Sequence, residues 1–228
     1  CISVCHGYFS ATTLMGVAPI RSDKLIVWTK QQLIDIARGL DACQVEKLAY
    51  VGFPKKYSAN GGKRADNSGL LILGPIEGAI EDPYLKENLE AVIVAMKRSV
   101  SKVRIRLHPH ERVGIPSVDA WIEKWGLDSS EQDLADQICA AGLIVGANSS
   151  ALLEAASSGK IVYEIKELVP EGVTSEGTFR VSVAELKSEI ERGRIHASSS
   201  EYSFDKDKLA VNITKLIYEL SIEKNKDI

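Results

Sequence analysis

The stretch GLIVGANSSALLEAASSGKIVYEI, residues 142–165, reads as a strand, a helix and a second strand. The apolar run LIVG predicts a buried strand, NSSALLEAASSG predicts a helix that begins near Ser149, and KIVYEI predicts the next strand. Strands joined by a helix run parallel, and continuous apolar strands are typical of a parallel sheet covered on both faces. The stretch therefore predicts an α/β fold of the Rossmann-like class.

The same alternation extends to both sides of this stretch. GLLILGP (69–75) and KVRIRLHP (102–109) predict strands. Between them, residues 82–100 predict a helix with Asp82 as N-cap and Pro83 in the first turn. Further helices are expected at residues 117–126, 129–142, 181–193 and 205–224. We therefore expect a Rossmann-like parallel sheet flanked by helices.

The N-terminal part of the chain shows a shorter alternation of the βαβ kind. A polar, glycine-rich segment, SANGGKRADNS at residues 58–68, follows it and is the best linker candidate. We predict an N-terminal βαβ or interdomain segment over residues 1–60 and a Rossmann-like domain over residues 61–228.

The composition excludes several classes of protein. A chain of 228 residues, 45% of them hydrophobic, is long enough to bury a core, and its net charge of −3 provides no basic field for nucleic acid. The longest apolar runs are too short to cross a bilayer. The four cysteines lack zinc-ligand spacing, and no DxD-like acidic cluster suggests a metal-chelated nucleotide sugar, so neither a metal nor a cofactor is expected. The motifs GxxxxGK[ST], GxGxxG and GxSxG are absent.

Three segments fall where ligands gather in such sheets, at the carboxyl ends of predicted strands. The first contains Asn148, Ser149 and Ser150, between the strand LIVG and the helix that follows. The N–H groups and dipole of a helix start suit a phosphate, and two hydroxyls add donors. The alternative is that Asn148 or Ser149 only caps the helix.

The second segment is the end of KVRIRLHP, where His108 reaches the edge of the sheet and Pro109 fixes the turn. An imidazole there can donate to a phosphate oxygen or protonate a leaving group. His110 is expected to be a loop histidine. Arg104 and Arg106 are expected to face solvent or form structural ion pairs.

The third segment, GPIEG, offers Gly74 and Glu77 for ligand contact, although Glu77 equally fits a solvated loop acid. Glu154, one turn into the helix after Ser149, faces either solvent or the site. In the site it would accept hydrogen bonds from a ribose or sugar hydroxyl. His6 follows the first predicted strand and is either a general base or a turn histidine.

The ordered set HG, VGFP, LLILGP, RLHP and GANSSALLEAASSGKIVYE, from about Cys5 to Glu164, resembles the C-terminal, donor-binding half of GT-B glycosyltransferases that make bacterial surface polysaccharides. It is most similar to the polysialyltransferase-like and Kdo-transferase-like capsule enzymes, which use CMP-activated acidic sugars. CDP-glycerol glycerophosphotransferases share the motif order. Their acidic TDYSS-like turn is GANSS here and their PTWR-like segment is GPIEG, which disfavours the glycerophosphotransferase reading.

The resemblance implies a metal-independent glycosyltransferase that transfers an acidic sugar from a CMP-linked donor to a bacterial glycan acceptor. It implies that His108, Ser149 and Ser150 hold the phosphate and cytidine of the donor, and that His6 is the base. Because a GT-B enzyme has two Rossmann-like domains, the acceptor-binding domain is expected to be missing from these 228 residues. The expected location is the cytoplasm, peripheral to the inner face of the inner membrane. A UDP-sugar 2-epimerase-like enzyme and a non-catalytic nucleotide-binding domain are the alternatives.

Overall fold

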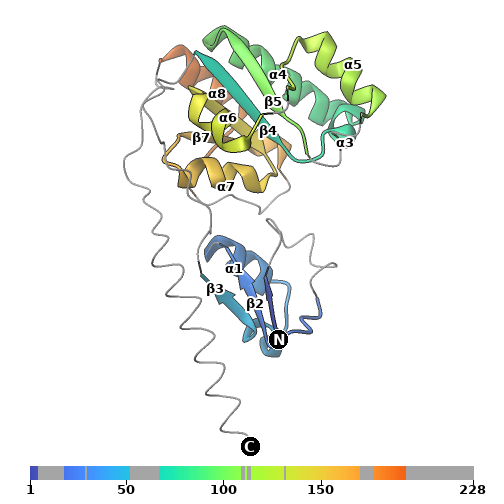
Figure 1. The fold of residues 1–228 in the computed structure, drawn as a ribbon, viewed down its shortest axis with the longest axis vertical. Coiled ribbons are helices and arrows are strands. Elements are labelled where there is room, and N and C mark those ends of the chain that lie inside the picture. Colours follow the sequence, from blue (N-terminus) through green and yellow to red (C-terminus); the bar gives the residue numbers. More distant parts are fainter. Residues whose placement is uncertain are drawn as a thin grey trace, which may run out of the picture. The chain divides into compact units, whose positions relative to one another are not determined.

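The computed structural model describes residues 1–4, 18–28, 30–51, 67–108, 111, 114–130, 132–169 and 177–193. These residues belong to two compact units, the first within residues 1–51 and the second within residues 67–193 (Figure 1). The boundary between the units falls outside the described ranges. The domain limits 1–60 and 61–228 therefore stay a prediction.

The first unit contains a small parallel sheet in the order β1-β2-β3. Its strands are β1 (Ile2–Val4), β2 (Lys24–Val27) and β3 (Leu48–Tyr50), and its helices are α1 (Lys30–Ala37) and α2 (Ala42–Val45). Leu25 and Val27 pack with Ile36 of α1 to form its core. The βαβ-like alternation predicted for the N-terminal part is confirmed.

The second unit contains a parallel sheet in the order β5-β4-β6-β7-β8. Its strands are β4 (Ser68–Leu73), β5 (Lys102–Arg106), β6 (Leu143–Ala147), β7 (Val162–Ile165) and β8 (Phe179–Val181). Asp128 adds a single parallel bridge to Arg104 of β5. With Asp128 counted as the outermost strand position, the order is that of a doubly wound Rossmann sheet, which reverses between β4 and β6.

Helices cover this sheet on both faces (Figure 1). They are α3 (Glu77–Glu81), α4 (Pro83–Ser99), α5 (Pro116–Trp125), α6 (Leu134–Ala140), α7 (Ser150–Ser157) and α8 (Val183–Glu191), with a 3-10 turn, η3 (Lys166–Leu168). Leu70 and Ile72 of β4 pack against α6 and α7, whereas α4 packs with α8. The predicted parallel sheet flanked by helices is confirmed. None of the helices in the described ranges is long and apolar enough to span a lipid bilayer.

The helix predicted over residues 129–142 begins later than expected. Helix α6 starts at Leu134, because Asp133 is its N-cap and accepts a hydrogen bond from the Ala135 N–H at 2.8 Å. Ser130 instead donates its N–H to the Asp128 carboxylate at 3.0 Å, which holds this segment beside β5. The predicted start of this helix at residue 129 is therefore wrong.

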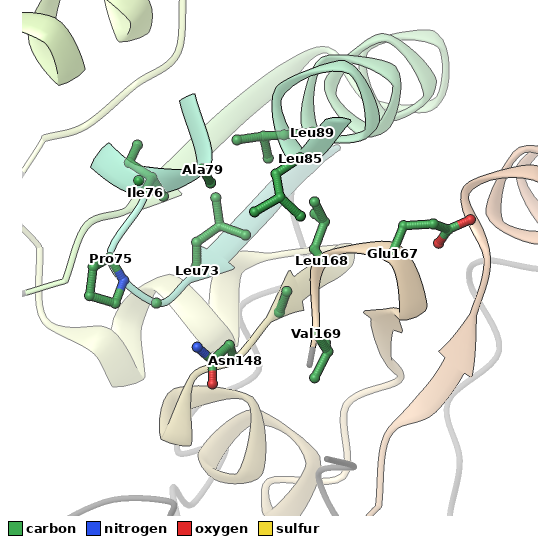
Figure 2. A pocket seen from close by; sticks show the side chains of 13 residues that line it. Leu73, Pro75, Ile76, Ala79, Leu85, Leu89, Asn148, Glu167, Leu168 and Val169 are labelled. Atoms are coloured by element: carbon green, nitrogen blue, oxygen red, sulfur yellow. The ribbon is translucent and has the colours of Figure 1, made fainter. Parts of the chain in front are cut away.

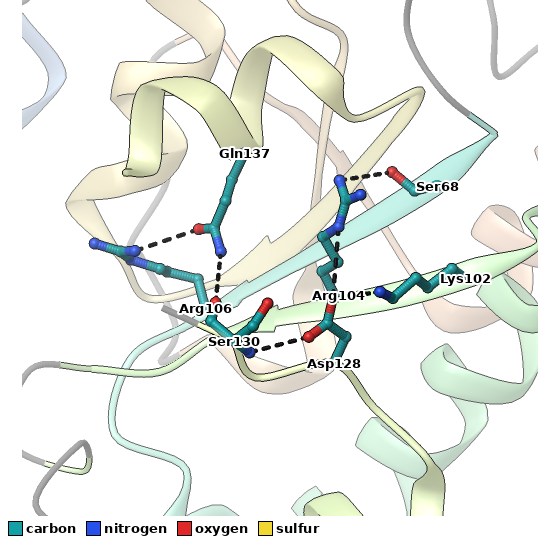
Figure 3. Close-up of polar contacts among 7 residues, drawn as sticks. All are labelled: Ser68, Lys102, Arg104, Arg106, Asp128, Ser130 and Gln137. Carbon is teal, nitrogen blue, oxygen red and sulfur yellow. Dashed lines mark hydrogen bonds and ion pairs between the residues drawn. The ribbon is translucent and has the colours of Figure 1, made fainter. Parts of the chain in front are cut away.

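A polar network replaces most of the ladder that a longer strand would form beside β5 (Figure 3). The Asp128 carbonyl accepts from the Ile105 N–H at 2.9 Å, and the Asp128 N–H donates to the Val103 carbonyl at 3.0 Å. The Asp128 carboxylate lies 2.7 Å from Lys102 Nζ and 3.7 Å from Arg104 Nε. One residue thus attaches this segment to the sheet through both its backbone and its side chain.

The two strand arginines of β5 also have structural partners (Figure 3). Arg104 donates to Ser68 Oγ at 3.2 Å. Arg106 donates to the Gln132 carbonyl at 2.6 Å and to Gln137 Oε1 at 3.3 Å. Arg104 thus forms a structural ion pair as expected, with Asp128, whereas the contacts of Arg106 described here are hydrogen bonds to neutral groups.

Asp128→Asn is expected to lower the free energy of unfolding by about 2 kcal/mol at neutral pH, because it removes charged hydrogen bonds from a largely buried site. Burial raises the pKa of the Asp128 carboxyl, but hydrogen bonds from Lys102 and Ser130 outweigh this and lower it to about 2. The stabilisation is therefore complete above the ordinary carboxyl pKa of about 4 and is lost as the pH falls toward 2. Urea unfolding measured from pH 7 down to the acid limit of the fold tests this.

The control is Glu87→Gln, which changes an exposed carboxylate on α4. Its effect should stay within about 0.5 kcal/mol, as is typical for surface substitutions. An Asp128→Asn effect that is as small, or that grows as the pH falls, would contradict the role assigned to this carboxylate.

Candidate functional site

A cavity of about 450 Å³ lies where the strand order reverses, at the carboxyl ends of β4 and β6 (Figure 2). Its size is within the range of small-molecule sites, and its position is where open α/β sheets bind ligands. The lining comes from the ends of these strands, from α3 and α4, and from the segment around η3. The lining residues are Leu73, Gly74, Pro75, Ile76, Gly78, Ala79, Leu85, Leu89, Ala147, Asn148, Glu167, Leu168 and Val169.

Asn148 contributes a polar side chain to the rim of this largely apolar cavity (Figure 2). It follows β6 directly, is exposed, and has a φ of 50°, a left-handed conformation that asparagine tolerates better than most residues. This conformation turns the chain from β6 into α7. No hydrogen bond joins its carboxamide to another described residue, so the group is available to a ligand.

Gly74 contacts the Asn148 turn from the neighbouring strand. Its N–H donates to the Ala147 carbonyl at 3.0 Å, which extends the ladder between β4 and β6. A Cβ at this position would lie 2.7 Å from the Asn148 carbonyl oxygen. The close approach requires glycine, and it places two of the residues predicted from the sequence side by side at the edge of the sheet.

Helix α7 begins at this same edge. Ser149 is its N-cap, and its hydroxyl accepts a hydrogen bond from the Ala151 N–H at 3.4 Å. Ser150 is the first helical residue, and both serines are half-buried. The capping alternative for Ser149 is therefore present in the structure. The first-turn N–H groups still give this end of the helix the positive character that suits an anion.

The acidic residues near the cavity differ in what they contact. Glu154 of α7 is 7% exposed and is not among the lining residues. Glu77 begins α3 and also lies outside the lining. The carboxylate of Glu167 accepts from the Val183 N–H at 3.1 and 3.2 Å and points away from the cavity, which only its stem lines (Figure 2).

His108 lies beyond the end of β5, the strand next to β4. The His108 side chain is exposed and does not line the cavity, and the His108 carbonyl accepts from the Glu111 N–H at 2.9 Å. Pro109 and His6 lie outside the described residues. The structure thus joins Gly74 to Asn148 and the start of α7, whereas the roles of His6, His108 and Pro109 stay predictions.

Glu111 is a residue near the cavity that the sequence did not indicate. Its side chain is 1% exposed, and its Oε1 accepts from the N–H groups of Ile76 and Glu77 at 2.5 and 2.9 Å. The only signal for it was an acid shortly after the strand end, in HPHE. Across the described ranges, no group of three or more His, Cys, Asp or Glu side chains is placed to hold a metal ion.

Comparison with known families and curated proteins gives no match: no family model matches the chain, and no curated protein does. Solved structures do match it. The Anabaena protein Alr3699/HepE, solved with UDP and glucose, has 14% identity and a TM-score of 0.57, and the match covers 95% of this chain and 71% of that one.

Two further structures match to a similar degree. The pneumococcal O-GlcNAc transferase GtfA, solved with UDP and GlcNAc, has 14% identity and a TM-score of 0.56, with 99% of this chain and 52% of that chain covered. Sucrose-phosphate synthase from Thermosynechococcus elongatus has 14% identity and a TM-score of 0.56, with 93% and 62% covered. The chain thus spans between about half and seven-tenths of the length of these proteins. At this identity the likeness shows a shared fold, in agreement with the Rossmann-like class.

Proposed function

We propose that this chain is the donor-binding part of a GT-B glycosyltransferase and holds a nucleotide-activated sugar at the carboxyl edge of β4 and β6. The observation that carries the proposal is the cavity at the point where the strand order reverses, with the Asn148 carboxamide on its rim and the start of α7 beside it. The fold shared with HepE, with an O-GlcNAc transferase and with a sucrose-phosphate synthase supports it.

Different parts of the donor would bind at different places in the site, according to the groups available there. The phosphate would lie at the start of α7, where Ser149, Ser150 and the first-turn N–H groups donate hydrogen bonds. An uncharged part of the donor would fill the apolar cavity next to it, with the Asn148 carboxamide as its polar contact. Glu154 would accept from a ribose or sugar hydroxyl. His108 would stabilise the charge on the departing phosphate, and His6 would take the proton of the acceptor hydroxyl.

The finer proposal is a CMP-linked acidic sugar as the donor and a bacterial surface glycan as the acceptor, at the inner face of the inner membrane. The resemblance of the sequence to capsule transferases supports it. A UDP-linked sugar is the second candidate, because two of the similar structures were solved with UDP.

Isothermal titration with CMP, CDP and UDP tests the proposal and separates the two donors. An affinity for CMP or CDP at least tenfold higher than that for UDP, a difference of about 1.4 kcal/mol in binding free energy, would support the CMP-linked donor. Tighter binding of UDP would favour the second candidate. Binding of none of the three at millimolar concentration would overturn the proposed nucleotide site.

Ser149→Ala is expected to weaken the nucleotide that binds by about tenfold, because a hydroxyl donor to the phosphate is lost. It should also destabilise the fold by about 1 kcal/mol, because the N-cap of α7 is lost. Titration and thermal unfolding of the same variant separate the two effects.

Ser182→Ala is the matched control, because Ser182 is the N-cap of α8 and accepts from the Glu185 N–H in the same way. It should cost similar stability and leave nucleotide affinity unchanged. Equal affinities for Ser149→Ala and Ser182→Ala would leave Ser149 with a capping role alone.

A further inference from the structure

Helix α3, which carries part of the cavity rim, has no cap of its own. Its N-cap residue is Ile76, whose side chain makes no capping hydrogen bond. The N–H groups at a helix start need acceptors, and buried N–H groups without one are costly. Here the acceptor is Oε1 of Glu111, 35 residues further along the chain, which takes the N–H groups of both Ile76 and Glu77.

Glu111 is also hydrogen-bonded to His108. The Glu111 backbone N–H donates to the His108 carbonyl at 2.9 Å. Glu111 therefore contacts the rim of the cavity through its side chain and the His108 carbonyl through its backbone. The lining residues Pro75, Ile76 and Gly78 stand directly at the α3 start that it caps.

The second carboxylate oxygen, Oε2, is buried and has no hydrogen-bond partner in the described part of the chain. Among the described residues, the carboxylate therefore acts on the start of α3 alone, through Oε1.

We infer that Glu111 is a positioning residue that couples His108 to the rim of the cavity. The inference rests on the proposed function, because the cavity matters only if it binds a nucleotide. The coupling itself can be tested without a ligand. Glu111 does not line the cavity and touches no reacting group; it acts through Ile76 and Glu77 on one side and through His108 on the other.

Amide hydrogen exchange followed by NMR tests the coupling without any ligand. In Glu111→Ala, the amides of Ile76 and Glu77 should exchange about tenfold faster or more, because each loses its acceptor. The amide of residue 111, which donates to the His108 carbonyl, should lose protection as well, because its side chain no longer anchors residue 111. Glu111→Gln keeps an acceptor oxygen and should retain most of the protection.

Asp133→Ala is the control, because it removes another capping carboxylate of this unit, at the start of α6, without touching the cavity. It should leave the amides of Ile76 and Glu77 unchanged. The coupling is overturned if Glu111→Ala leaves these amides protected, if residue 111 keeps its protection while they lose theirs, or if Asp133→Ala has the same effect.

The unaltered protein decides the question if Glu111→Ala does not fold. Ile76 and Glu77 should then show higher protection than Gly78, which lies in the same turn but whose N–H has no acceptor among the described residues. Equal protection at the three positions would overturn the inference.

A double-mutant cycle with CMP links the coupling to the site. His108→Ala should weaken CMP binding at least threefold more in the unaltered background than in the Glu111→Ala background, because Glu111 positions the histidine. Equal factors in the two backgrounds would overturn the coupling at the site. Absence of CMP, CDP and UDP binding to the unaltered chain would instead overturn the proposed function, while the amide exchange would still decide the inference.

Discussion

Gly146→Ala is expected to lower the free energy of unfolding of the second unit by about 4 kcal/mol, at the upper end of single-substitution effects. A Cβ on Gly146 would lie 2.0 Å from the Ile72 carbonyl oxygen and 2.7 Å from Leu152 Cδ2. Ile72 is the direct register partner of Gly146 in the adjacent β4. Because the obstacle is backbone at the centre of the sheet, a rotamer change cannot relieve the clash.

Urea unfolding of three glycine variants checks this expectation. The Cβ added by Gly78→Ala would meet no atom within 4 Å. This variant should be as stable as the unaltered protein or slightly more stable, because Gly78 lies in α3 and alanine favours helix more than glycine does. Gly69→Ala meets the terminal Met96 Cε at 2.8 Å, a flexible end that can move, so its cost should be intermediate. A Gly146→Ala protein as stable as Gly78→Ala would refute the close approach of β6 to β4.

The central part of the fold was predictable because its signals are local. The strand, helix and strand of residues 142–165 are β6, α7 and β7, and Ser149, one of the two residues considered as a cap, is the N-cap of α7. The strand at the outer side of β5 was not predictable. It is reduced to one bridge at Asp128, whose attachment depends on side chains of β5 that no local pattern connects to it.

The candidate site likewise has a part that the sequence predicted and a part that it did not. Gly74 and the Asn148 turn were expected at one edge, because the carboxyl ends of parallel strands coincide there, and the structure brings them together. Glu111 escaped prediction because its partners, Ile76 and Glu77, are far away in sequence and contribute only backbone N–H groups. Backbone donors have no sequence signature, so a cap supplied from a distant residue is visible only in the folded chain.

Under the proposed function, His108→Ala is expected to reduce the turnover number for sugar transfer by about 10²–10³-fold, the usual effect of losing one hydrogen-bond donor to a developing negative charge. The imidazole is exposed beyond the end of β5, next to the strand that carries the cavity rim. A hydrogen bond from His108 to the departing phosphate stabilises the transition state and the released nucleotide more than it stabilises the intact nucleotide sugar. The KM for the donor should therefore change much less than kcat.

Steady-state kinetics of transfer from the preferred nucleotide sugar provides the measurement. His108→Gln keeps an N–H donor and should recover part of the lost rate, whereas Lys187→Ala, an exposed change on α8, should transfer sugar at the unaltered rate. A normal kcat for His108→Ala would remove His108 from the reaction. An increase in KM alone would assign it to ground-state binding, because only an interaction that strengthens in the transition state changes kcat.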